Sequence, residues 1–151
     1  MIEKRLEELS IKIPEFVAPA ANYLPYVKSG NQIFISGQLP AQNGKMAFVG
    51  KVGKDIDVAQ AKEAAKICAI NLIAVLKAAC DGDLNKVKKC VKLGIFINAV
   101  DDFANHPEIG NGASDLMVEI FQEKGKHARF AMGAGSLPFN VPVEIDAVFE
   151  I

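Results

Sequence analysis

The stretch DVAQAKEAAKICAINLIAVLKAAC, residues 57–80, predicts the longest helix of the chain. Asp57 is a favourable N-cap, and Gln60 three residues later completes a capping box. Apolar residues then recur at intervals of three and four as far as Cys80, as the buried face of an amphipathic helix does. Many of these apolar residues are alanines, so we expect a β-sheet to approach this helix closely.

The segments around this helix show the short apolar runs and the alternation of apolar and polar residues that are typical of strands. A turn at Ser29-Gly30-Asn31 joins the first two strands as a hairpin. We expect a loop over residues 101–113, a second helix that Ser114 caps and Gly125 ends, and a short helix in the first ten residues. The predicted strands cover residues 26–28, 32–36, 46–49, 87–100, 127–135 and 141–151.

The resulting order β-β-β-α-β-α-β-β predicts one α+β domain over residues 1–151, preceded by a helical extension at residues 1–12. Two helices pack on one face of a mixed sheet, so its other face has too little helix to cover it. Phe34, Phe48 and Phe96 are expected on that open face. Association with further copies of the chain is an economical way to bury it.

Composition limits the function classes. The chain of 151 residues fits one domain, half of it is apolar, and its net charge is −1, which argues against nucleic acid and anionic membranes as partners. It has no apolar run long enough to span a bilayer, and its charged start is unlike a signal peptide. Three cysteines, an odd number, favour free thiols and a cytoplasmic location.

The sequence lacks the motifs of several common metal-binding, phosphate-binding and catalytic sites. The only histidines, His106 and His127, have no partner at a metal-ligand spacing, and there is no Cys-x-x-Cys pair. No glycine-rich phosphate loop or Gly-x-Ser-x-Gly elbow is present. Cys68, Cys80 and Cys90 are expected to be small core residues.

Arg129 is the most informative charged residue, because the strand after it contains only small or apolar residues. A buried arginine is costly unless an anionic group meets it. Glu144 begins the next strand, and if the two strands pair, both side chains could line one pocket. The residues alone allow two interpretations, a structural ion pair or a carboxylate clamp beside a carboxylate that handles protons or orients water.

Three stretches resemble the YjgF/Rid family of reactive intermediate deaminases, which includes the proteins called endoribonuclease L-PSP. GNQIFISGQLP (residues 30–40) resembles the first signature of that family. ARFAMGAGSLPFNVPVEIDAVFE (residues 128–150) resembles its C-terminal signature, and NKVKKCVKLGIFINAVDDF (residues 85–103) resembles its central strand. The resemblance covers roughly residues 23–150.

The resemblance implies a chorismate-mutase-like α+β fold and a homotrimer with a barrel-like core and pockets at the subunit interfaces. Archetypal members of the family hydrolyse 2-aminoacrylate and related enamines or imines to 2-keto acids and ammonia, and they need no cofactor. By position, Arg129 would hold the substrate carboxylate, and Glu144 would orient the attacking water or relay a proton.

Further substrate-binding residues follow from the same resemblance. Tyr23 matches a pocket tyrosine, and Ser36 and Gly37 match the Ser-Gly of the first signature. The pocket asparagine of the archetype falls near Ser114, although Asn111 could take its place. Without the resemblance, Tyr23 could be an interface aromatic, and Ser36 and Gly37 could simply end a strand at a bulge.

The sequence also departs from the archetype. Ala131 stands where many members have cysteine, and the loop NHPEIGNGA (residues 105–113) is longer, so that it could cover the pocket and bring in His106. These departures leave a second function open, a non-catalytic trimer that binds small carboxylates or regulates a partner enzyme. Ribonuclease activity or inhibition of translation, the third alternative, is disfavoured by the near-neutral charge.

Overall fold

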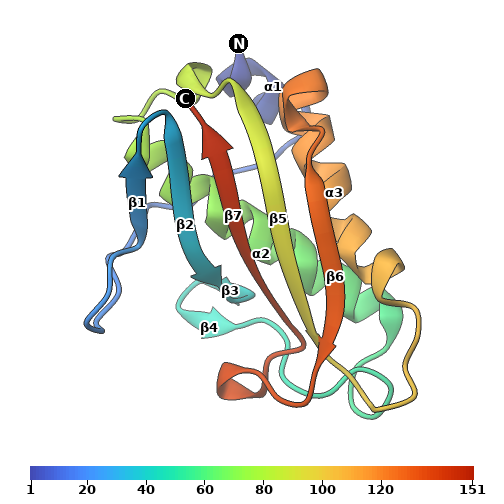
Figure 1. Ribbon diagram of the computed structural model, residues 1–151. Coiled ribbons are helices and arrows are strands. Elements are labelled where there is room, and N and C mark those ends of the chain that lie inside the picture. The colour runs from blue at the N-terminus through green and yellow to red at the C-terminus, as the bar shows by residue number, and fades with distance from the viewer.

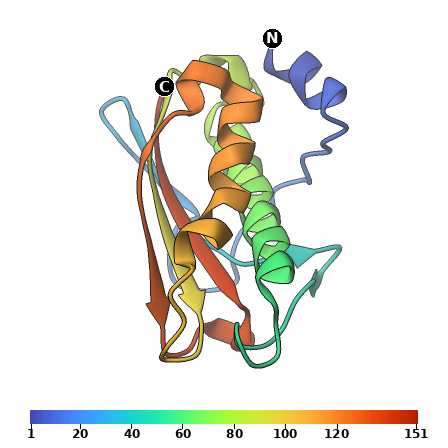
Figure 2. The same ribbon diagram turned by 90° about the vertical axis from the view of Figure 1, so that its right-hand side faces the viewer.

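The computed structural model describes all residues, 1–151, and contains one five-stranded sheet with the order β1-β2-β7-β5-β6. All neighbours are antiparallel except β5 and β6, which are parallel. Helices α2 and α3 lie side by side across one face, and the other face is open (Figures 1 and 2). The α+β fold is therefore confirmed. The strands are β1 (Tyr26–Ser29), β2 (Gln32–Gln38), β5 (Lys89–Asn98), β6 (Ala128–Ala134) and β7 (Val143–Glu150).

Helix α2 (Val58–Ala79) follows the sequence prediction closely. Asp57 accepts a hydrogen bond from the Gln60 peptide, and the Gln60 side chain accepts one from the Asp57 peptide, so the capping box is complete. The apolar residues of the helix are buried against the sheet, including Cys68. Cys68, Cys80 and Cys90 are all free and buried, as core residues.

Helix α3 (His106–Phe121) begins eight residues before Ser114, so the predicted Ser114 cap is wrong and the predicted loop holds only over residues 101–105. Pro107 stands in the first turn, where a proline costs no hydrogen bond. Gly110 and Gly112 concealed the helix because glycine usually weakens one. A Cβ at Gly112 would collide with the Lys62 carbonyl oxygen, so this glycine lets α3 pack closely against α2.

The third predicted strand is also corrected. β3 (Ala41–Gln42) and β4 (Lys45–Met46) form a separate two-stranded ribbon around Asn43-Gly44, outside the main sheet. Phe48 lies beyond this ribbon and packs against the core, whereas Phe34 and Phe96 do lie on the open face.

The N-terminal helix α1 (Ile2–Glu8) lies within the first ten residues, as predicted, and packs near the end of α3. Its Leu6 is buried, and Arg5 Nε donates to the Glu119 carbonyl oxygen at 2.7 Å. The remaining elements are the 3₁₀ helices η1 (Leu84–Lys86), η2 (Gln122–Gly125) and η3 (Pro138–Asn140). No helix combines the length and the apolar character that crossing a bilayer requires.

Candidate functional site

Arg129 lies on the helix-facing side of β6, because it pairs with Leu93 of β5, whose side chain is in the core. Its Nη1 donates to Ser114 Oγ at 2.9 Å, and its Nη2 donates to the Pro107 carbonyl oxygen at 3.3 Å. Both acceptors belong to α3. The side chain is partly buried, and none of the four ion pairs in the structure includes it.

His127 completes this arrangement. Its Nε2 lies 2.9 Å from Ser114 Oγ, and its Nδ1 lies 2.6 Å from the Gly125 carbonyl oxygen. We call Arg129, Ser114, His127 and the Pro107 carbonyl the arginine region. From the sequence, His127 was weighed only as a metal ligand, and its position in the arginine region was not predicted. Its position two residues before Arg129 was the available signal, because alternate residues of an extended chain point the same way.

Glu144 lies on the open face of β7, at a close contact between β7 and the neighbouring strand β2. A Cβ at Gly37 would collide with the Glu144 carboxylate, so the glycine makes room for it. Ser36 Oγ donates to the Leu24 carbonyl oxygen at 2.7 Å, which ties β2 to the segment that carries Tyr23. Tyr23 is 55% exposed and, together with Gly37, lines a cavity of about 460 Å³. We call Tyr23, Ser36, Gly37 and Glu144 the glutamate region.

Two carboxylates stand in succession on this face of β7. Partial burial raises the pKa of the Glu144 carboxyl above its ordinary 4.5, and the charge of Asp146 raises it further. Desolvation likewise raises the pKa of Asp146, whose carboxylate lies over Gly94. A carboxyl group with a raised pKa is better suited to exchange protons near neutral pH.

The two regions do not meet within one chain. β5 lies between β6 and β7, so the strands of Arg129 and Glu144 do not pair, and the condition for one pocket within a chain is not met. Arg129 pairs with Leu93, on the helix-covered face, and Glu144 pairs with Phe96, on the open face. The intrachain ion pair between Arg129 and Glu144 is therefore excluded as well.

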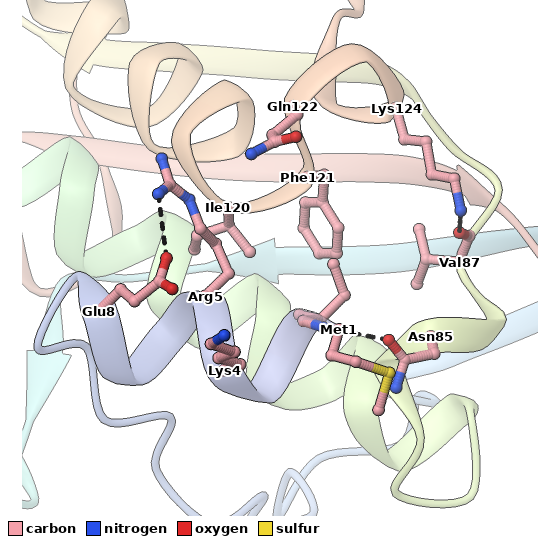
Figure 3. A pocket seen from close by; sticks show the side chains of 11 residues that line it. Met1, Lys4, Arg5, Glu8, Asn85, Val87, Ile120, Phe121, Gln122 and Lys124 are labelled. Atoms are coloured by element: carbon pink, nitrogen blue, oxygen red, sulfur yellow. Dashed lines mark hydrogen bonds and ion pairs between the residues drawn. The ribbon is translucent and has the colours of Figure 1, made fainter.

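Asn111 joins neither region, since it lines a hollow between α2 and α3 together with Lys62 and Asp115. His106 lines another hollow with Phe103 and Gly133 at the end of β6. A third hollow lies between α1 and the end of α3, where Arg5 is engaged by Glu8 (Figure 3). It contains no predicted site residue. No three His, Cys, Asp or Glu side chains converge as a metal site would require.

Comparison with known proteins shows the family of the chain. Residues 3–149 match the profile of the family described as "YjgF/chorismate mutase-like, putative endoribonuclease". The chain belongs to this family. The resemblance found in the signature stretches is thereby confirmed.

Three relatives of this YjgF-family chain are informative. Protein TCP17 of Trypanosoma cruzi is 41% identical, and the alignment covers 99% of this chain and 94% of that one. The crystal structure of the protein Atu1372, of unknown function, from Agrobacterium tumefaciens has a TM-score of 0.92 at 47% identity, covering 99% and 91%. The 2-iminobutanoate/2-iminopropanoate deaminase of Dermatophagoides farinae is 30% identical, covering 93% and 94%.

Proposed function

We propose that this YjgF-family protein hydrolyses small carboxylate-bearing enamines or imines, of the 2-aminoacrylate type, to 2-keto acids and ammonia. The observation that carries the proposal is the state of Arg129. It is a partly buried guanidinium, held by two neutral oxygen atoms, with no carboxylate of its own chain beside it. Such a group is suited to a carboxylate ligand, because a planar fork binds two carboxylate oxygens at once.

The reaction places modest demands on the site. An enamine becomes an imine when its β-carbon takes a proton and its nitrogen releases one, and water then adds to the electrophilic imine carbon. The carbon–nitrogen bond of the adduct breaks, ammonia leaves, and the carbonyl of the keto acid forms. Glu144 is our candidate for orienting the water and carrying its proton to the departing nitrogen, in keeping with its raised pKa. Arg129 holds the substrate beside that water.

We further propose that each site is shared between two copies of a homotrimer. Arg129 and Glu144 face opposite sides of one sheet, so a second copy is needed to supply the missing partner. The open face supports such an assembly, since Phe34 and Met132 on it are 45% and 49% exposed. The deaminase of Dermatophagoides farinae, a relative along almost the whole chain, supports the chemistry.

The direct test is ammonia release from freshly generated 2-aminoacrylate by the wild type and by Arg129→Ala. We expect release faster than spontaneous hydrolysis, and a loss of at least about a hundredfold in kcat/KM in the variant, because a bound carboxylate loses its charged partner. Arg129→Lys should recover only part of the activity, since lysine lacks the planar fork. Arg5→Ala is the matched control, because the Arg5 side chain hydrogen-bonds to Glu8 and Glu119, away from both regions.

The same experiment addresses the alternative function. Wild-type protein that binds pyruvate in a calorimeter but does not accelerate ammonia release would instead be a carboxylate-binding protein. Turnover by Arg129→Ala equal to that of an active wild type would refute the role of Arg129 in catalysis, and equal affinity for pyruvate would refute its role in binding.

A further inference from the structure

The two ring nitrogens of His127 have different partners, and these partners fix the position of its proton. The Gly125 carbonyl oxygen can only accept a hydrogen bond, so Nδ1, 2.6 Å away, must carry the proton. In a neutral ring Nε2 is then an acceptor, and the group 2.9 Å from it is the Ser114 hydroxyl, which must donate.

This assignment decides what Ser114 does. Its only proton is directed to His127, so its oxygen presents lone pairs to Arg129 Nη1, 2.9 Å away. The chain of donors and acceptors therefore runs from Arg129 through Ser114 and His127 to the Gly125 carbonyl. Ser114 has no proton left for a substrate, and its contact is with the guanidinium.

Arg129 uses only some of its N–H donors in hydrogen bonds within the chain. A guanidinium has five N–H groups, and one points to Ser114 while another points to the Pro107 carbonyl oxygen. The remaining N–H groups are enough for a bidentate carboxylate. Gly110 leaves room for this orientation, since a Cβ there would lie 3.0 Å from Arg129 Nη1.

We infer that His127 is a positioning residue that acts through Ser114 to hold the Arg129 guanidinium in the orientation in which it binds a carboxylate. The inference rests on the proposed function, because it assigns the same arginine to substrate binding. It changes the role of Ser114 from a substrate-binding residue to a support of Arg129.

A double-mutant cycle tests the inference. His127→Leu and Ser114→Ala should each raise the Kd for pyruvate, and the KM of the deaminase reaction, by about tenfold, as the loss of one well-oriented hydrogen bond does. The double variant should be no weaker than either single one, since both residues act through one chain of hydrogen bonds. Independent effects that multiply to about a hundredfold would overturn the inference.

Conservative replacements separate positioning from general structural damage. His127→Gln places an amide oxygen near the position of Nε2 and should recover most of the affinity, as should Ser114→Thr, which keeps the hydroxyl. If neither conservative variant recovers the affinity, while all variants keep the thermal stability of the wild type, the proposed hydrogen-bond chain is contradicted.

NMR keeps the two proposals distinguishable. The ¹⁵N shifts of His127 should report the Nδ1-protonated neutral ring, and His127→Leu should sharply increase the exchange of the Arg129 side-chain protons with water. If both NMR results are as expected, but the wild type neither binds pyruvate nor turns over substrate, the proposed function is defeated and the His127–Ser114–Arg129 support remains. A ring protonated at Nε2 would defeat the support itself.

Discussion

The arginine region and the glutamate region differ in how the chain holds their charged groups. Arg129 donates hydrogen bonds to Ser114 Oγ and to the Pro107 carbonyl oxygen, both in α3, and His127 in turn contacts Ser114. Glu144, in contrast, occupies the space that Gly37 leaves by having no Cβ, and the charge of Asp146 opposes its ionisation. The first region is suited to bind a fixed charge, and the second is suited to change its charge during a reaction.

The largest expected effect tests whether the two regions act together across a subunit boundary. Arg129→Ala and Glu144→Gln should each be nearly inactive alone. Assembled together in equal amounts, they should recover about one quarter of wild-type activity, because in random mixed trimers that fraction of interfaces has both native residues. Co-expression with two affinity tags, followed by light scattering and the ammonia assay, measures this.

Mixed assemblies as inactive as the single variants would show that the two residues do not complete a shared site. Co-expression of Arg129→Ala with the double variant Arg129→Ala/Glu144→Gln is the control, since it contains no chain with a native arginine and should show no such recovery.

A smaller effect on stability tests the close contact that places α3. Gly112→Ala should destabilise the fold by about 2 kcal/mol, within the usual range for overpacking, because its Cβ would meet the Lys62 backbone. Gly110→Ala, in the same helix, gains the same helix propensity but meets the flexible end of Arg129. It should keep its stability within about 1 kcal/mol and weaken pyruvate binding instead.

Urea unfolding and calorimetry distinguish the two glycine variants. Equal destabilisation by both would mean that the helix–helix contact at Gly112 is no tighter than the contact between α3 and Arg129.

The smallest effect concerns the pH dependence of the glutamate region. Asp146→Asn removes one of the two causes that raise the pKa of Glu144, so the part of the pH–rate profile that depends on Glu144 should move toward lower pH. Burial, the larger cause, remains. Lys92→Gln is a control on the same face. Because Lys92 lowers the pKa of Asp146, its loss leaves Asp146 less ionised, so the profile should move toward lower pH by less than in Asp146→Asn, or not at all.

The same carboxyl groups affect stability with a definite sign. Their raised pKa values mean that the folded chain binds more protons than the unfolded chain above about pH 4, so stability falls as the pH rises through the folded values. Asp146→Asn should therefore be more stable than the wild type at neutral pH and equal to it at pH 3. A stability difference that is the same at both pH values would contradict this linkage.

Much of the fold was predictable because its signals are local. The Asp57 capping box, the alanine-rich face of α2 and the alternation in β7 each depend on residues close in sequence, and each is confirmed. The start of α3 was not predictable from such signals. Gly110 and Gly112 weaken an isolated helix, and the contacts that require glycine there, with Arg129 and with Lys62, come from β6 and α2.

The sequence by itself singled out the candidate residues, since Arg129 is the one charged residue of a strand that is otherwise small or apolar, and Glu144 stands at the start of the next strand. Only the tertiary structure decided how they are arranged. The insertion of β5 between β6 and β7 places them on opposite faces, and the packing of α3 on the sheet brings Ser114 and His127 to the arginine. Strand order and helix packing depend on contacts between distant segments, which no local pattern encodes.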